Sequence, residues 1–159
     1  IETPLVSPTI IVRDGNGNPT LETRGGVERS WSYDRVNRMV SATDGNNKTT
    51  LTEYDDHGDV VLITDANEHT TRQEYDARRR LKAVTDARRY RTHFVLDPVG
   101  NRIEEHHPND RIIVHTYDVL NRRTRSTDNL DGPETPIDEV DYDADGHVTF
   151  RSDARGAET

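Results

Sequence analysis

The stretch Tyr-Asp-Asp-His-Gly-Asp-Val-Val-Leu-Ile-Thr, residues 54–64, decides the fold of this chain. Its Asp55 and Gly58 frame a four-residue step typical of a tight turn, because Asp accepts backbone N–H groups and Gly tolerates positive φ. The run of Val, Leu, Ile and Thr that follows is rich in β-forming residues and ends at Asp65. The stretch therefore predicts a turn followed by a short β-strand.

The Tyr-Asp pair that opens this stretch recurs at a fixed interval. Successive pairs lie 21 residues apart, except for a last interval of 25 that holds a four-residue insertion near residues 129–136. The pairs are Tyr33-Asp34, Tyr54-Asp55, Tyr75-Asp76, Leu96-Asp97 (a degenerate copy), Tyr117-Asp118 and Tyr142-Asp143. Self-similarity at a period of this size indicates a tandem repeat in which each copy is one supersecondary unit.

A second set of turn residues keeps the same register. Eleven residues after the start of each pair stands an acidic residue, or His107 in one unit, and the acidic members are Asp44, Asp65, Asp86, Asp128 and Asp153. Four residues after the start of each pair stands a turn-former in most units: Asn37, Gly58, Gly100, Asn121 and Gly146, with Arg79 as the exception. Each unit is therefore predicted to be one β-hairpin, and its tyrosine is placed to stack on the ring of the next unit.

These units predict an all-β fold of tandem β-hairpins in one long antiparallel sheet. Roughly twelve strands are expected, and open twisted sheets of more than about ten strands curl or split. Only 30% of the residues are apolar, which is too few to fill the two inner faces of a sandwich. No window carries the apolar spacing of an amphipathic helix. A curved sheet with one modestly apolar face fits best.

The sequence is divided into two regions, and both of its ends are interpreted as truncated. Residues 1–30 are interpreted as a degenerate repeat carrying an insertion, and residues 31–159 as the repeat array. The chain starts at Ile1 without Met and stops midway through a unit. We therefore expect a piece of a longer polypeptide, truncated at both ends.

Composition removes several classes of function. A net charge of −9 disfavours nucleic acid as a partner, and its Arg-rich stretches are interleaved with acidic residues. The absence of Cys excludes disulfides and thiolate metal sites. No stretch approaches the ~18 apolar residues needed to span a bilayer, so membrane insertion is not expected.

The repeat resembles the RHS/YD-repeat family, which includes bacterial polymorphic toxins, insecticidal toxin-complex subunits and teneurins. Residues 54–60 and 75–81 follow the family's Tyr-Asp-x-x-Gly-Arg-Leu pattern closely, and the resemblance covers about residues 24–159. It implies a spiral β-shell of which this chain is an arc. It also implies a secreted or surface bacterial protein whose partners are the remaining repeats and a toxin or effector domain.

The resemblance and the exposed sheet leave three functions open. The leading one is a non-catalytic shell or scaffold segment. The second is a module that binds glycans or a surface receptor through the sheet face, since carbohydrate binding is a further property the resemblance suggests. The third is self-assembly, because a truncated sheet has two unpaired edge strands that can pair with another copy.

Candidate catalytic and metal sites are sparse, so no enzyme and no cofactor are predicted. Asp14, Asn16 and Asn18 form an oxygen-rich loop that is a weak calcium candidate, although an Asx-turn explains it equally. Residues 141–146 read Asp-x-Asp-x-Asp-Gly, but Ser152 stands where a calcium loop needs Glu. Residues 97–100 resemble an autoproteolytic Asp-Pro-x-Gly, which the repeat turn also explains. The seven histidines are interpreted as surface turn residues, and no motif assembles Ser, His and Asp.

Overall fold

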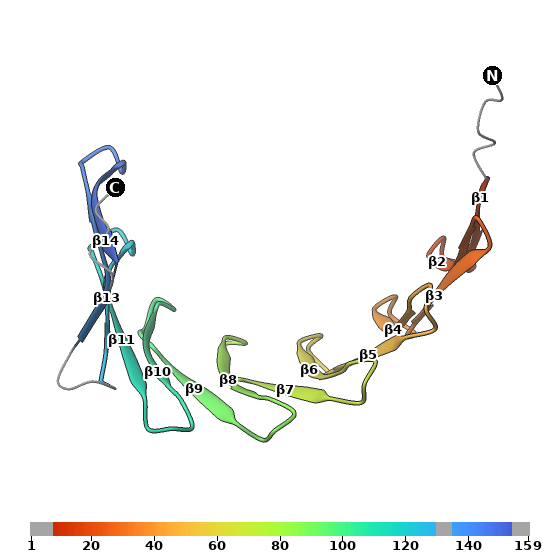
Figure 1. Cartoon of the computed structure of the whole chain (residues 1–159), viewed down its shortest axis with the longest axis horizontal. Coiled ribbons are helices and arrows are strands. Elements are labelled where there is room, and N and C mark those ends of the chain that lie inside the picture. Colours follow the sequence, from red (N-terminus) through yellow and green to blue (C-terminus); the bar gives the residue numbers. More distant parts are fainter. Residues whose placement is uncertain (1–7, 130–134, 154–159) are drawn as a thin grey trace. The chain divides into compact units, whose positions relative to one another are not determined.

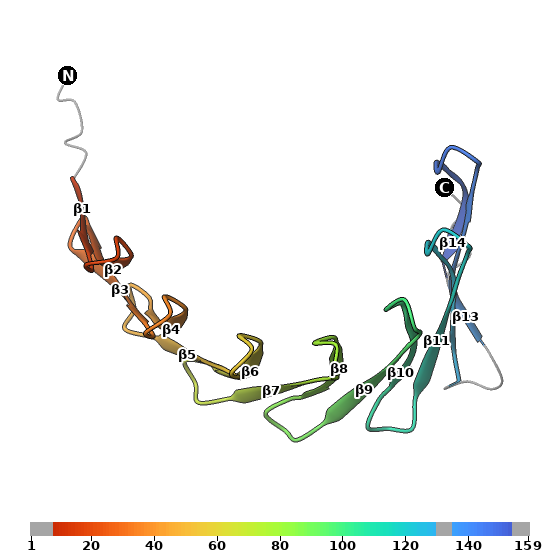
Figure 2. The ribbon, with the colours of Figure 1, turned by 180° about the vertical axis from the view of Figure 1, so that it is seen from behind.

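The computed structural model describes residues 8–129 and 135–153, which form strands and turns (Figure 1). Fourteen strands lie in one open sheet in the order of the chain, and the strand pairs are antiparallel. Figure 2 shows the same succession of hairpins from behind. The strands are β1 (Thr9–Arg13), β2 (Pro19–Arg24), β3 (Val27–Tyr33), β4 (Met39–Thr43), β5 (Thr49–Tyr54), β6 (Val60–Thr64), β7 (Thr70–Tyr75), β8 (Leu81–Thr85), β9 (Arg91–Leu96), β10 (Arg102–His106), β11 (Ile112–Tyr117), β12 (Arg123–Asp128), β13 (Thr135–Tyr142) and β14 (Val148–Asp153).

The all-β class and the antiparallel hairpin sheet are confirmed, and the described ranges contain no helix. Consequently no helix long and apolar enough to cross a membrane occurs among them. The strand number exceeds the roughly twelve expected, because β1, β2 and β3 already occupy residues 9–33. The chain divides into two compact units, Ile1–Arg72 and Gln73–Thr159.

One turn construction joins most of the strands. At Asp55 the main-chain carbonyl accepts the N–H of Gly58 at 3.1 Å, and the N–H of Asp55 donates to the carbonyl of Asp59 at 2.9 Å. The fourth residue has a positive φ, which is 91° at Gly58. The register of β5 and β6 shifts between Glu53 and Tyr54, so the turn includes a β-bulge.

The fourth turn position keeps positive φ even where no glycine stands there. Within residues 8–129 and 135–153, the residues with positive φ other than glycine are Asn37, Asn47, Glu68, Arg79, Arg89, Asp110 and Asn121. Asparagine tolerates this region well, whereas Glu and Arg adopt it at a cost. The surrounding ladder therefore imposes the turn geometry on these units.

The joint between β2 and β3 differs from the Asp turns. β2 and β3 are connected by Gly25 and Gly26, whose φ values of 59° and 80° suit a two-residue turn. Asp14 consequently lies 20 residues before Asp34 rather than 21. The division at residue 30 remains a prediction, and most of the insertion predicted near 129–136 lies outside the described residues.

The apolar core is thin. Among the described residues, the buried hydrophobic side chains are Ala83 and Phe94. Phe94 lies opposite Glu105 in the ladder, and the guanidinium carbon of Arg102 stands 3.7 Å from its ring centroid. With so little apolar burial, the strand ladders and the turn hydrogen bonds carry much of the order.

Candidate functional site

The Tyr-Asp turns are closed by their aspartate side chains. Oδ1 of Asp34 accepts the N–H groups of Val36 at 2.9 Å and Arg38 at 3.0 Å. Oδ2 of Asp34 lies 2.6 Å from Nε of Arg38. The same two-sided closure recurs at Asp76 with Arg80 and at Asp118 with Arg122. We call this arrangement of an Asp with the Arg four residues later the Asp-Arg clasp.

Each clasp arginine also reaches the next hairpin unit. Nη1 of Arg38 donates to the main-chain carbonyl of Asp55 at 3.1 Å. Nη1 of Arg80 donates to the carbonyl of Asp97 at 2.8 Å, and Nη1 of Arg122 lies 3.5 Å from the carbonyl of Asp143. These arginines are 42 residues apart, so the clasp appears in every second unit.

Asparagine takes the clasp position in a unit between them. Nδ2 of Asn101 donates to Oδ2 of Asp97 at 2.8 Å and to Oδ1 of Asn121 at 2.9 Å. Asn18 makes the same pair of contacts with Asp14 and Asn37, each at 3.0 Å. Neighbouring turns are thus linked by side chains whether Arg or Asn occupies this position.

The tyrosines tie the same turns to the preceding strand. The hydroxyl of Tyr54 donates to the carbonyl of Met39 at 2.9 Å, and that of Tyr117 donates to the carbonyl of Arg102 at 2.8 Å. The guanidinium carbon of Arg38 lies 4.6 Å from the Tyr54 ring centroid. Arg122 covers Tyr142 in the same way at 4.3 Å.

Ring-on-ring stacking was predicted for the tyrosines, and the geometry differs. No ring contact joins Tyr33 to Tyr54 or Tyr117 to Tyr142 within the described parts of the two units. Tyrosines of successive units stand two strands apart, which is about 9.5 Å. Rings stack at roughly 4.5–7 Å. A guanidinium group fills the space that a second ring cannot reach.

The carboxylates of Asp34 and Asp76 are held in their ionised form. The backbone N–H of Arg38 lowers the pKa of Asp34 below its ordinary value, against an upward effect of desolvation, and the Arg38 guanidinium lowers it further. Arg80 acts in the same way on the pKa of Asp76. The predicted pair aspartates thus lie where their charge organises the turn.

The turns at the other rim repeat the motif with different partners. Oδ1 of Asp86 accepts the N–H groups of Arg88 and Tyr90 at 2.9 and 2.8 Å, and equivalent bonds form at Asp44 and Asp65. Two further aspartates expected in such turns lie at strand ends instead, Asp128 in β12 and Asp153 in β14. Asp128 accepts Nε of Arg111 at 2.8 Å. Gly58, Gly100 and Gly146 all take the positive-φ position of Tyr-Asp turns.

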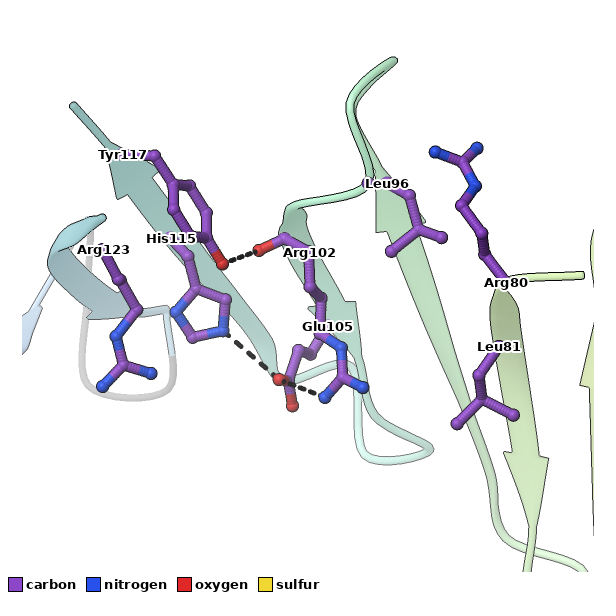
Figure 3. Close-up of a pocket in the computed structure, with 9 residues that line it drawn as sticks. Arg80, Leu81, Leu96, Arg102, Glu105, His115, Tyr117 and Arg123 are labelled. Atoms are coloured by element: carbon purple, nitrogen blue, oxygen red, sulfur yellow. Dashed lines mark hydrogen bonds and ion pairs between the residues drawn. The ribbon is translucent and has the colours of Figure 1, made fainter. Parts of the chain in front are cut away.

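A polar cluster that the sequence did not reveal joins β10, β11 and β12 (Figure 3). Oε1 of Glu105 accepts a hydrogen bond from Nη1 of Arg102 at 2.9 Å and lies 3.3 Å from Nε2 of His115. Nδ1 of His115 lies 2.9 Å from Oγ of Ser126, its direct partner in the ladder. Tyr117 completes the wall of an open hollow of about 380 Å³. Only the strand register brings these residues together.

This Ser-His-Glu order resembles a hydrolytic triad, but its setting differs. Ser126 is 3% exposed and does not line the hollow, so its hydroxyl is withdrawn from solvent. Desolvation alone would raise the pKa of Glu105, yet bonds from Arg102 and His115 hold it below its ordinary value. The cluster acts as a cross-strand polar link that satisfies the buried imidazole of His115.

The oxygen-rich loops use their carboxylates for turns. Oδ1 of Asp14 accepts the N–H groups of Asn16 and Asn18, each at 2.9 Å. Such bonds make an Asx-turn, and calcium binding there stays an untested prediction. Asp143, Asp145 and His147 present ligand atoms close together in another turn, all exposed. Asp143 there accepts the N–H groups of Asp145 and His147.

Comparison with known proteins agrees with the repeat. Residues 54–92 match the RHS Repeat family. No curated protein matches the chain. The Photorhabdus luminescens Tc holotoxin pore with the mutation TccC3-D651A is similar in structure, with a TM-score of 0.72 and 18% identity over 95% of this chain and 9% of that chain. The TcdB2-TccC3 crystal structure gives a TM-score of 0.59 and 14% identity over 96% of this chain and 12% of that one.

The fold and its turns define a tandem β-hairpin repeat protein. Residues 54–92 of it match the RHS Repeat family, and its fold is similar to parts of Tc toxin structures. The chain spans about a tenth of the length of the toxin-complex chains that share its fold.

Proposed function

We propose that this chain is a non-catalytic wall segment of a shell in a secreted or surface-exposed bacterial RHS/YD-repeat protein. The remaining repeats of the same polypeptide complete the wall. The shell encloses or presents a toxin or effector domain. The proposal needs no cofactor, nucleic acid or membrane insertion.

The observation that carries it is the side-chain link between neighbouring turns, which recurs along the sheet. Arg38, Arg80 and Arg122 each tie one hairpin unit to the next, and every unit adds strands to the same open sheet. Such a construction extends indefinitely by addition of like units, as a wall requires. Its likeness to parts of two toxin-complex structures supports the same role.

Limited proteolysis of the full-length polypeptide that contains this chain tests enclosure. We expect the polypeptide outside the repeats to resist trypsin in the native protein. It should become sensitive when Tyr54→Ala and Tyr117→Ala together weaken the wall. Tyr90→Phe, which changes an exposed tyrosine outside the repeat register, serves as the control. Equal sensitivity of the native protein and the double variant would argue against enclosure.

A second candidate, self-association, is favoured by the edge strand β1. Ile10, Ile11 and Val12 are 59%, 48% and 47% exposed, and only one side of β1 is paired within the described residues. An apolar edge of this kind is a template for another strand. Light scattering of the chain against concentration should show oligomers that Ile11→Lys suppresses. A strictly monomeric chain would remove this candidate.

A further inference from the structure

At the rim that carries the Asp44 and Asp65 turns, two neighbouring turns depart from the pattern of these two copies. The regular copies are Asp44-Gly45-Asn46-Asn47-Lys48 and Asp65-Ala66-Asn67-Glu68-His69. The third copy, residues 86–90, ends in Tyr90. The fourth copy, residues 107–111, begins with His107-Pro108. Tyr90 thus replaces the basic side chain of the regular copies. His107 replaces the Asp that caps the turn, and Pro108 replaces a small residue.

These departures meet in one place. Tyr90, His107 and Pro108 line a single groove of about 640 Å³ between the two turns, together with Thr92, Asn109 and Arg111. Tyr90 is the one tyrosine outside the Tyr-Asp register, and it is 57% exposed. Several departures from the repeat pattern that fall on one groove point to a function there.

At the turn position where the regular copies have Asp, His107 has a ring nitrogen without a hydrogen-bond partner. Nε2 of His107 is buried and makes no hydrogen bond, and the nearest carboxylate oxygen, Oε2 of Glu105, is 3.7 Å away. Asp at this position would instead accept two turn N–H groups, as Asp86 does. The His107 turn therefore lacks the side-chain cap that closes the regular turns.

The other polar groups of the groove are also uncommitted. The side chains of Tyr90, Thr92 and Asn109 make no hydrogen bonds within the described residues. Arg111 directs Nε and Nη2 to Oδ2 of Asp128, each at 2.8 Å, which neutralises its charge while leaving further N–H donors. The groove is therefore nearly neutral and rich in donors.

We propose that this groove binds an extended, proline-containing peptide segment. The Tyr90 and Pro108 rings offer apolar surfaces between which a proline ring can pack, as in aromatic-lined grooves that take polyproline II segments. Such a segment presents carbonyl acceptors and few N–H donors, which matches the donors of Asn109 and Arg111. The inference does not depend on the shell role.

The test is an NMR titration of the ¹⁵N-labelled 159-residue chain. The probe is a blocked peptide with the core Pro-Ala-Ala-Pro, compared with the same peptide carrying Ala for both prolines and with maltotriose. We expect saturable shifts of the Thr92 and Asn109 amides with the first peptide alone. Tyr90→Lys and His107→Asp, which restore the regular pattern, should bind at least about tenfold more weakly without a lower melting temperature.

His69→Lys changes the position equivalent to Tyr90 in another unit, and it should leave binding unaltered. Tyr90→Phe keeps the ring and should retain most of the affinity, which separates loss of the ring from loss of the fold. The proposal is overturned if the proline peptide gives no saturable shifts. It is also overturned if Tyr90→Lys binds equally well, or if maltotriose saturates the groove and the peptide does not.

Discussion

Nη1 of Arg80 donates a hydrogen bond of 2.8 Å to the main-chain carbonyl of Asp97, the aspartate that opens the next hairpin unit. Nε of the same guanidinium lies 2.7 Å from Oδ2 of Asp76 in its own unit. One planar side chain thus closes a turn and links it to its neighbour. Lysine carries the same charge but cannot make both contacts in this geometry.

Arg80→Lys should therefore lower the melting temperature by roughly 2–4 °C, the shift that a modest loss of stability produces in a chain of this length. Arg88→Lys is the matched control, because the Arg88 side chain makes no hydrogen bond within the described residues. Thermal unfolding followed by circular dichroism measures both. Equal melting of the two variants would show that the link between units contributes nothing.

Two substitutions of Tyr54 should separate the contribution of its ring to stability from that of its hydroxyl. Tyr54→Phe loses the bond to the carbonyl of Met39 and should cost about 0.5–1.5 kcal/mol. Tyr54→Ala also removes the ring that Arg38 covers and should cost about 3 kcal/mol. Urea unfolding gives both values. If Tyr54→Ala has the midpoint of the parent, the tyrosines do not hold the sheet.

The fourth turn position should respond in opposite directions in two units. Arg89 has φ of 66°, so Arg89→Gly should relieve strain and stabilise the chain by about 0.5–1 kcal/mol. Gly58 has φ of 91°, and a Cβ there meets only Arg38 Nη1 at 3.6 Å. Gly58→Ala should therefore destabilise by about 1 kcal/mol through its backbone alone. Both changes are read from urea midpoints, and shifts of the same sign would refute this account of the turn.

Much of the fold follows from sequence because its signal is local. The spacing of Tyr54 and Asp65 marks two turns, and the Val-Leu-Ile-Thr run between them can only be a strand of the length observed. The clasp partner was harder to foresee, because Arg38 acts on Asp55 in the next unit and recurs only in alternate units. The Arg of the Tyr-Asp-x-x-Gly-Arg-Leu pattern marks the clasp position, but no local pattern shows that this side chain reaches the next unit.

The polar cluster and the rim groove depend on register and not on local sequence. Ser126 meets His115 because β11 and β12 pair at those residues. His107 and Tyr90 meet because their turns lie at the same rim. In both cases residues ten or more positions apart share no motif, so sequence reasoning treated these histidines as surface turn residues.

Ser126→Ala should test the cluster. It would leave Nδ1 of the buried His115 without its partner, at a cost of about 1–3 kcal/mol. Thr124→Val breaks a hydrogen bond with Thr116 between exposed positions of the same strand pair and should cost less. Urea unfolding of both variants gives the two free energies of unfolding, and their difference shows how much the buried bond to His115 contributes. Equal costs would mean that burial of His115 does not matter.

Acid should weaken the turns. The folded-state pKa of Asp76 lies below its ordinary value of 3.8, with the Arg80 N–H as the main cause. A depressed pKa stabilises the fold above the ordinary pKa, and that contribution is lost as the pH falls below it. Melting temperature should therefore hold between about pH 7 and 5 and fall below about pH 4. Asp76→Asn should flatten the acid limb, and a parent that gains stability in acid would contradict the assignment.

The most direct test of the shell role is a cryo-electron microscopy structure of the full-length polypeptide that contains this chain. The account predicts that β1–β14 form consecutive strands in the wall of a hollow shell, with the Arg80–Asp97 bond present and polypeptide density inside. An isolated sheet with solvent on both faces, enclosing nothing, would contradict it.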